Sequence, residues 1–269
     1  MTRPFSFTPE QRRAFLEGGL MRVSGAVPLD AVEAMAERIW RTLGRQLGAI
    51  RGRPETWPQD AQPELKQMAR AGVFAATLGP GVRAVLDDFF GGRGWGPPRL
   101  PPTPLGIRFP TPARPWHVPT RRWHLDHAEP YDPWPACVRM FLCLEAVEPG
   151  GGGTFYVSGS HRVVGAIAPE MRASRDRVGS ARIVKRLKGE SRWFADLCSK
   201  GEAEPGRVTR FMHEGSELRG VPLKVAEMTG AAGDLLLWHP NLLHAASPAN
   251  CRNTPRLVIS VTIMADGAG

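Results

Sequence analysis

The sequence is poor in cysteine. Its 269 residues include four cysteines, Cys137, Cys143, Cys198 and Cys251. No two of them have the C-x-x-C spacing of a zinc knuckle or a redox-active dithiol, which excludes both motifs. We therefore expect free, mostly buried thiols, as is typical of proteins in a reducing compartment.

Long apolar segments are absent as well. No stretch approaches the roughly 20 apolar residues that a membrane helix needs. The first residues, MTRPFSFTPEQRRAFLEGG, have neither an apolar h-region nor a small-residue cleavage site. We therefore expect a cytoplasmic protein that does not contact a membrane.

Acidic residues are outnumbered by basic ones, 26 against 35, which gives a net charge of +9. Such a charge suits nucleic acid, acidic lipid or a small anion as partner. No block of lysine and arginine with interleaved aromatics occurs, so nucleic acid is disfavoured. We expect a small-molecule substrate and lean towards an anionic one, such as a carboxylate or an acyl thioester, although a neutral natural product fits the sequence equally well. The oligomeric state is not indicated.

The amino-terminal part, residues 1–96, has mainly helical patterns. The spacing predicts helices over 8–20, with Thr8 as N-cap, and over 30–48, with Asp30 as cap. A further helix is expected over 62–89, and a strand over 20–27. An apolar stripe at helical spacing in the second helix indicates core packing; it consists of Val32, Met35, Ile39, Leu43 and Leu47.

Residues 97–120 are rich in proline but also carry apolar side chains, so we expect an ordered loop that forms a wall or lid beside a site. From 121 to 264 the pattern changes to short apolar strands with turns between them: 138–149, a short strand within 150–162, 224–230, 233–239 and 256–264. A charged insertion at about 169–222 includes one or two helices around 191–200. We predict one domain, mainly β with flanking helices, with a sandwich or jelly-roll core.

The segment HLDH begins at His124. Residues two apart in a strand project from the same face, so His124 and Asp126 can converge on one point while His127 points away. The best third ligand is His244, between two predicted strands, whereas His239 is expected to be a packed core histidine. Two histidines and one carboxylate form the facial triad of non-haem iron(II) oxygenases; zinc would prefer four ligands.

Arg256 follows His244 by twelve residues, at the start of the last strand. A buried guanidinium there could bind a carboxylate in two-pronged fashion. A metal with open positions and a fixed arginine suits a 2-oxo acid, whose keto and C1 carboxylate oxygens bind iron while its far carboxylate meets the arginine. A structural ion pair is the alternative role for Arg256.

Together the motifs HLD (124–126), GGGGTFYVSGSHR (150–162) and GDLLLWHPNLLH (233–244), followed by Asn250 and Arg256, resemble the phytanoyl-CoA dioxygenase family of iron(II)/2-oxoglutarate oxygenases. The resemblance covers about 121–264, and the turn reads SGSHR here where PGSHR is usual. It implies a double-stranded β-helix (jelly-roll, cupin-like) core, with O2 as cosubstrate and ascorbate as a reductant.

The resemblance also implies site residues. His124, Asp126 and His244 would bind iron(II), and Arg256 would bind the C5 carboxylate of 2-oxoglutarate. Thr154 and Arg139 are further candidates for holding the cosubstrate. Trp123 and His127 are candidates for the substrate pocket, Trp123 with core packing as its alternative. For His161, a turn-closing role and a cosubstrate role remain equally open.

The presence of Asp126 narrows the expected reaction. Related halogenases have a small residue in place of this carboxylate, so hydroxylation, or another oxidation such as desaturation, is favoured. Two alternatives remain: a non-catalytic jelly-roll protein that binds a small acid, and an oxygenase acting on nucleic acid. Related nucleobase demethylases have a second arginine six positions after the first, where this chain has Thr262, which disfavours the latter.

Overall fold

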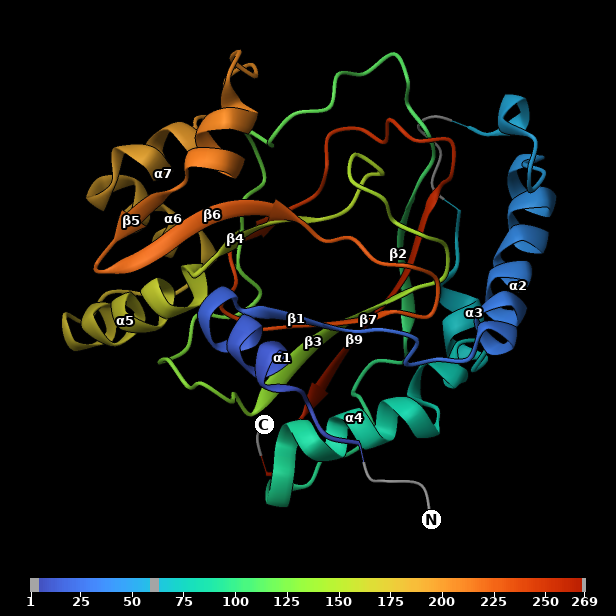
Figure 1. Cartoon of the computed structure of the whole chain (residues 1–269), viewed down its shortest axis with the longest axis horizontal. Coiled ribbons are helices and arrows are strands. Elements are labelled where there is room, and N and C mark those ends of the chain that lie inside the picture. Colours follow the sequence, from blue (N-terminus) through green and yellow to red (C-terminus); the bar gives the residue numbers. More distant parts are fainter. Residues whose placement is uncertain (1–4, 59–62, 268–269) are drawn as a thin grey trace.

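The structure is a computed structural model that describes residues 5–58 and 63–267. Two antiparallel sheets form its centre (Figure 1). The larger sheet has the strand order β1-β7-β3-β9-β2 and the smaller one β5-β6-β4-β8. The strands are β1 (Leu20–Val23), β2 (Thr103–Arg108), β3 (Cys137–Cys143), β4 (Phe155–Ser158), β5 (Ser216–Leu218), β6 (Val221–Glu227), β7 (Leu235–Trp238), β8 (His244–Ala245) and β9 (Arg256–Met264).

Helices flank the two sheets. The α-helices are α1 (Pro9–Arg13), α2 (Leu29–Leu47), α3 (Lys66–Arg70), α4 (Pro80–Phe90), α5 (Ser160–Ala173), α6 (Ser180–Glu190) and α7 (Arg192–Leu197). Two π-helices, η1 (Ala14–Gly18) and η5 (Thr209–Glu214), and three 3-10 helices, η2 (Pro54–Thr56), η3 (Ala75–Leu78) and η4 (Gly91–Arg93), complete the set. The predicted class, mainly β with flanking helices and a jelly-roll core, is confirmed.

The longest strand, β9, shows how the sheets are layered. Leu257, Ile259 and Ile263 belong to the core cluster on the helix side of the larger sheet. Val258 belongs instead to a smaller cluster between the sheets. Because side chains alternate along a strand, Arg256 shares the face of Val258, and this inner face carries the site described below.

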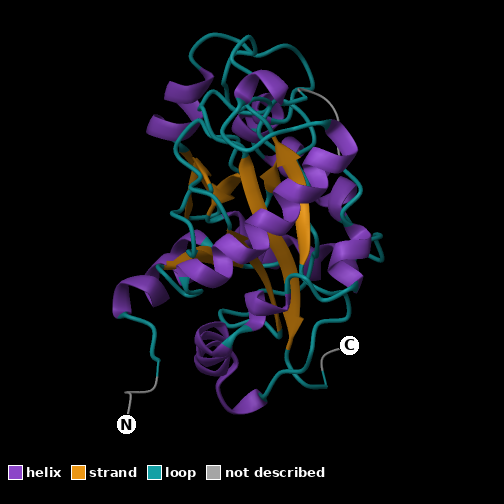
Figure 2. Cartoon of the chain, turned by 90° about the vertical axis from the view of Figure 1, so that its right-hand side faces the viewer, coloured by secondary structure: helices purple, strands orange, loops and turns teal. Residues whose placement is uncertain are grey.

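Helix α2 packs its predicted stripe against the larger sheet, and Figure 2 shows helices in front of the strands on this side. Leu47 of the stripe is only partly buried. Gly48, at φ 68°, ends the helix in the left-handed conformation that glycine adopts without strain. The predicted cap was wrong, because Pro28 is the N-cap and Asp30 lies in the first turn, where its carboxylate accepts a hydrogen bond from the Ala31 N–H.

The helix expected over 62–89 is divided into α3, η3 and α4. Gly72 has a positive φ of 72°, and Gly79 is extended before Pro80 starts α4. Proline is well suited to the first turn of a helix but not to its interior, so the chain restarts there. The helix predicted over 8–20 agrees better with the structure, because Thr8 forms a capping box with Gln11. Its second half is a π-helix.

The segment 97–120, expected to be a loop, contributes strand β2 to the larger sheet. Its prolines hid the strand, but β2 pairs only with β9 and lies at the edge of the sheet. An edge position tolerates a residue without an N–H, such as Pro104. The strand expected over 138–149 ends earlier, at Cys143, and the strand expected over 224–230 begins earlier, at Val221.

The GSHR turn opens helix α5, which was not predicted. A Cβ on its N-cap, Gly159, would lie 2.3 Å from the Pro222 carbonyl oxygen, so the close approach to β6 requires glycine. Helices α5, α6 and α7 pack with the smaller sheet around a second core cluster. The insertion at 169–222 is thus more helical than expected, since α7 matches the prediction around 191–200 but α6 precedes it.

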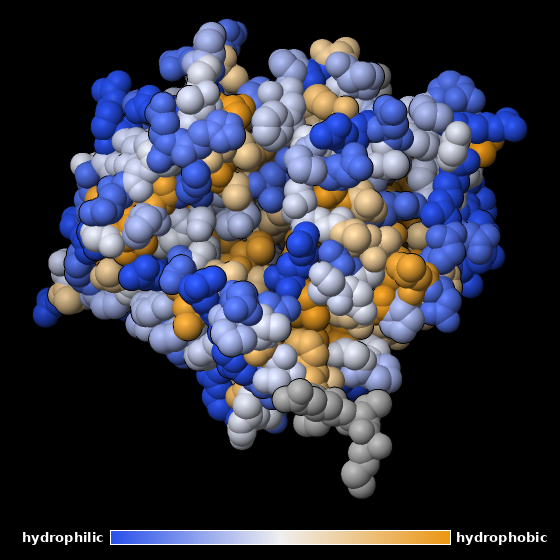
Figure 3. Space-filling view, viewed as in Figure 1, coloured by the Kyte–Doolittle hydropathy of each residue, from blue (hydrophilic) through white to orange (hydrophobic). Residues whose placement is uncertain are grey.

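All four cysteines are free, and Cys143 and Cys198 are buried. Figure 3 shows hydrophilic residues spread over one face of the molecule, with smaller apolar areas between them. Within the described ranges, no helix combines the length and the apolar character needed to cross a membrane.

Candidate metal centre

The HLD segment lies beside β8 at the edge of the smaller sheet. His124 and His244 are directly opposite each other in an antiparallel bridge. Each donates its backbone N–H to the carbonyl of the other, at 2.9 and 3.0 Å. On the other side, His244 is paired with Tyr156 of β4. Sheet pairing therefore places two histidines that are 120 residues apart in sequence next to each other on one face.

His124, Asp126 and His244, hereafter the triad, each offer a ligand atom, and the three atoms lie within 4.8 Å of one another. Metal–nitrogen and metal–oxygen bonds are about 2 Å long, so small side-chain rotations suffice to close the three around an ion. The structure thus brings together the three residues that the sequence singled out.

Backbone carbonyls fix the tautomers of both histidines. The ring nitrogen Nδ1 of His124 lies 2.8 Å from the Arg122 carbonyl oxygen, and that of His244 lies 2.9 Å from the Leu242 carbonyl oxygen. A carbonyl can only accept, so Nδ1 carries the proton in both rings. Nε2 is then left with a lone pair, the arrangement found in metal-binding histidines.

His244 is buried, and burial, with repulsion from His124, lowers its pKa to about 4. The imidazole is therefore neutral at neutral pH. Only the neutral ring offers a lone pair to a metal.

Asp126 forms an ion pair with Arg139 of β3, with 2.9 Å between its Oδ2 and the arginine Nε. Arg139 also donates a hydrogen bond of 2.6 Å from Nη1 to the Thr262 hydroxyl. Thr262 and Arg139 are opposite each other in the β3–β9 register. The arginine thus fixes the position of the carboxylate through its Oδ2.

A cavity of about 420 Å³, here called the triad cavity, contains all three triad residues together with Arg139, Thr154 and Arg256. Arg256 is 4% exposed, and burial lowers the pKa of its guanidinium to about 10. Its Nη2 donates to the Gly106 carbonyl, whereas its Nε has no hydrogen-bond partner in the described part of the chain. A buried cation with an unpaired donor calls for an anion.

The triad cavity includes residues that the sequence did not single out. Arg108 and Leu105 reach it from β2, and Phe141 from β3. Because β2 was not predicted, its two residues carried no recognisable signal. Thr154, by contrast, was predicted and is buried within the lining.

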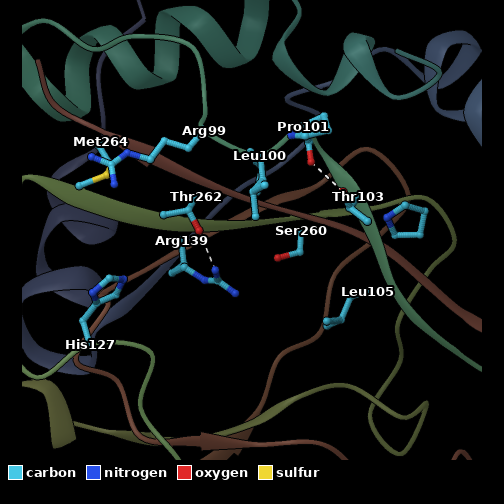
Figure 4. Close-up of a pocket in the computed structure, with 12 residues that line it drawn as sticks. Arg99, Leu100, Pro101, Thr103, Leu105, His127, Arg139, Ser260, Thr262 and Met264 are labelled. Atoms are coloured by element: carbon cyan, nitrogen blue, oxygen red, sulfur yellow. Dashed lines mark hydrogen bonds between the residues drawn. The ribbon is translucent and has the colours of Figure 1, made fainter. Parts of the chain in front are cut away.

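The two candidates for the substrate pocket, His127 and Trp123, lie in different parts of the structure. His127 lines a pocket of about 380 Å³ beside the triad cavity, together with Arg139 (Figure 4). Trp123 does not line the triad cavity. It is buried in the second core cluster, with its Nε1–H donated to the Pro119 carbonyl at 2.8 Å.

The remaining histidines of the motifs are enclosed by the fold. His161 and His239 have ring centroids 5.0 Å apart and are 1% and 2% exposed. Neither belongs to the triad cavity. The expectation that His239 is a packed core histidine is confirmed.

A jelly roll whose inner face gathers two histidines, one carboxylate and a buried arginine defines a class, the 2-His-1-carboxylate metal oxygenases. The sequence profile of the phytanoyl-CoA dioxygenase (PhyH) family matches residues 15–256, and the chain belongs to this family. The protein is therefore an iron(II)- and 2-oxoglutarate-dependent oxidoreductase, as predicted.

Solved structures share the fold at low sequence identity. HygX from Streptomyces hygroscopicus with nickel and 2-oxoglutarate bound has a TM-score of 0.56 and 16% identity, over 98% of this chain and 89% of its own. The alpha-ketoglutarate-dependent carbocyclase SnoK from nogalamycin biosynthesis has a TM-score of 0.56 and 18% identity, over 98% and 87%. The epimerase SnoN of the same biosynthesis has a TM-score of 0.52 and 16% identity, over 95% of this chain and 81% of its own. The comparison with curated proteins gave no match.

Proposed function

We propose that this protein is a non-haem iron(II)/2-oxoglutarate-dependent dioxygenase that hydroxylates, or otherwise oxidises, an unactivated C–H bond of a small organic molecule. Succinate and CO2 are the coproducts, O2 is the cosubstrate, and ascorbate serves as an external reductant. The observation that supports this most is the convergence of the triad in a cavity that also holds Arg256.

In this proposal Nε2 of His124, Nε2 of His244 and Oδ1 of Asp126 are the protein ligands of iron(II). Their donor chemistry fits, since two neutral imidazoles and one carboxylate leave further coordination positions open. Bound iron(II) supplies the activation of O2, which the protein's own side chains cannot perform. The chain contributes the fixed tautomers of the two histidines and the ion pair with Arg139 that positions Asp126.

The cosubstrate is held by three side chains of the triad cavity. Arg256 receives the C5 carboxylate of 2-oxoglutarate, which pairs its buried charge. The Thr154 hydroxyl would be a further donor to the cosubstrate within this cavity, and Arg139, which pairs with Asp126, lines the same cavity from β3. Phe141 and Leu105 line the same cavity with apolar surface and keep water out.

The outcome of oxidation depends on the substrate. The structural neighbours include a carbocyclase and an epimerase, so one fold accommodates several reaction outcomes. We infer a small-molecule substrate, which His127 would border from the neighbouring pocket that it lines with Arg139. We further propose that 1–269 is one oxygenase domain, in which 1–96 supports the core, 121–264 forms it, and 97–120 and 169–222 border the substrate.

The test compares metal-loaded wild-type protein with Asp126→Ala. Wild-type protein is expected to bind one iron(II) and one 2-oxoglutarate under anaerobic conditions and to release succinate when O2 is admitted. Asp126→Ala should lose iron binding and succinate release. His127→Ala is the matched control, because His127 is next to the motif but outside the triad, and it should keep both the metal and the cosubstrate.

Two results would contradict the proposal. One is succinate release by Asp126→Ala at the wild-type rate. The other is wild-type protein that binds 2-oxoglutarate without any metal dependence and never forms succinate, which would indicate a small-acid-binding protein without turnover.

A further inference from the structure

A cleft of about 490 Å³, here called the basic cleft, adjoins the triad cavity. The cavity and the basic cleft share Arg108, Arg122 and Ala246. His117 and Arg121 also line the basic cleft, and Glu202 is the one carboxylate among its described lining residues. The side of the triad cavity that adjoins the basic cleft is therefore bordered by positive charge.

Arg108 lies directly opposite Arg256 in the β2–β9 register, and both line the triad cavity. Like charges on opposing strand positions destabilise a sheet unless something compensates them. The arrangement is nevertheless fixed, since the buried Asn250 donates to the Arg108 carbonyl at 3.0 Å. Burial, then repulsion from Arg114 and Arg122, lowers the pKa of Arg108.

No carboxylate of the described residues forms an ion pair with the guanidinium of Arg108 or Arg256. Glu227 acts on Arg256 from a distance. Its two oxygens accept the backbone N–H groups of Gly150 and Gly153 at 2.7 and 2.9 Å. The facing arginines therefore leave room for a bound anion to compensate their charge.

Arg122 has φ 62°, in the left-handed region that costs a non-glycine residue energy. Its carbonyl accepts the Nδ1–H of His124, so the strained turn orients the triad. Glycine or asparagine would adopt this turn at lower cost. The arginine side chain at this turn lines both the triad cavity and the basic cleft.

The charges of the triad cavity do not balance after loading. Four arginines line it, Arg108, Arg122, Arg139 and Arg256, against one carboxylate, Asp126. The two positive charges of iron(II) are offset by the two negative charges of 2-oxoglutarate, so the excess remains. A second anion would offset it.

We propose that Arg108 and Arg122 bind a compact oxyanion, a carboxylate or a phosphate monoester, that belongs to the primary substrate. The anion sits where the basic cleft meets the triad cavity, and the carbon skeleton attached to it extends towards the triad. This inference rests on the proposed function, because it assigns the remaining charge to the substrate after the cosubstrate has taken Arg256.

The experiment uses full-length protein saturated with nickel(II), in place of iron(II), and with 2-oxoglutarate. Calorimetric titrations with acetate and with methyl phosphate distinguish the two oxyanions, and acetamide is the neutral control. One of the two anions should bind with a stoichiometry of one, whereas acetamide should not bind. Arg122→Asn, which keeps the left-handed backbone accessible, and Arg108→Gln should each weaken anion binding by at least about 10-fold.

Arg121→Asn is the matched control. Arg121 lines the basic cleft but not the triad cavity, and its Nε donates to the Lys200 carbonyl at 2.9 Å. Arg121→Asn removes the same charge as Arg122→Asn but should change the dissociation constant of the added anion by less than about 2-fold. Equal weakening in Arg121→Asn and Arg122→Asn would reduce the effect to general surface charge and overturn the inference.

The affinity for 2-oxoglutarate, measured in the same variants, separates the possible failures. If Arg108→Gln weakens the binding of 2-oxoglutarate rather than that of the added anion, Arg108 belongs to the cosubstrate site and the inference is overturned. Wild-type protein that loads nickel and 2-oxoglutarate but binds no second anion would overturn it as well, with the proposed function intact. Wild-type protein that loads neither would contradict the proposed function itself.

Discussion

Two pairs of histidines lie close together in the structure and differ in what surrounds them. The ring centroids are 4.1 Å apart for His124 and His244 and 5.0 Å apart for His161 and His239. The first pair, here the open pair, lies in the triad cavity with Asp126. The second, the closed pair, packs against Tyr131, whose ring is 5.8 and 6.2 Å from the two imidazoles.

The ring nitrogens explain the different roles. In the open pair each Nδ1 donates to a carbonyl two residues earlier, and each Nε2 stays available. In His239 both nitrogens are used, since Nε2 donates to the Asp132 carbonyl and Nδ1 accepts the Asn241 N–H. His161 donates from Nε2 to the Leu16 carbonyl, and its Nδ1 has no partner among the residues described.

A lowered pKa does not distinguish the pairs. Burial lowers the pKa of His244 and of His239 to about 4, and that of His161 to about 3. What distinguishes the open pair is a neighbouring carboxylate and a cavity in front of the free nitrogens. A perturbed histidine therefore marks a metal site only together with those two features.

The largest expected difference between the pairs concerns metal binding. His244→Gln should weaken metal affinity by more than about 100-fold, beyond the effect typical of residues that only support a ligand. His239→Gln should change it by less than about 3-fold, since His239 has no nitrogen to offer. Anaerobic titration with iron(II) measures both. Similar losses in the two variants would show that the closed pair takes part in the site.

The second expected effect concerns Arg256, which lines the triad cavity together with the open pair. Arg256→Gln removes the charge that the far carboxylate of 2-oxoglutarate would meet, so the dissociation constant should rise by about 30-fold or more. Metal affinity without cosubstrate should be unchanged, because Arg256 offers no ligand. Unaltered 2-oxoglutarate binding would instead assign Arg256 a purely structural role.

The sequence indicated the open pair because its signal is local and periodic. HLD places two ligands on one face of an extended segment, and the spacing from His244 to Arg256 matches a turn and a strand start. Strand β9 was predicted with its observed bounds, since its nine residues are mostly apolar and β-branched and include no proline. Such patterns need no knowledge of distant partners.

Other features depend on distant partners and could not be predicted. Pro104 lies in a strand because β2 has only one neighbour, a fact of sheet order. Arg108 enters the triad cavity only through its pairing with Arg256. In the closed pair, His239 was predicted to be a core residue, whereas the role of His161 was undecided. The hydrogen bond from His161 to Leu16 joins residues 145 apart, so no pattern in the sequence indicates it.

A substitution at Gly19 tests whether the closed pair acts by packing alone. Gly19 has φ 82°, and a Cβ there would lie 2.7 Å from both Nδ1 of His161 and Cδ1 of Leu242. Gly19→Ala should lower the free energy of unfolding by about 2–3 kcal/mol, from overpacking plus backbone strain.

Gly25→Ala is its matched control. Gly25 has φ 60°, and a Cβ there would have nothing within 4 Å, so Gly25→Ala should cost only the backbone strain, about 1 kcal/mol. Denaturant unfolding of metal-free protein measures both variants. Equal losses would show that the closed pair yields to the extra methyl group and is loosely packed.

The smallest expected effect is a pH dependence of stability contributed by His161. Its pKa is about 3 in the folded protein, against 6.5 as its ordinary value. Between these values the unfolded chain binds the extra proton, so stability rises with pH and is lost as pH falls below about 6.5. The slope is at most about 1.4 kcal/mol per pH unit.

Measured on metal-free protein, wild type should therefore lose about 2 kcal/mol more than His161→Gln between pH 6.5 and 5. Glutamine can still donate to the Leu16 carbonyl but does not titrate, which removes this proton uptake without removing the hydrogen bond. His239 and His244 remain in both proteins, so their contributions cancel in the difference. Parallel stability curves would mean that His161 accepts a proton in the folded state, and the closed pair would then be open to water after all.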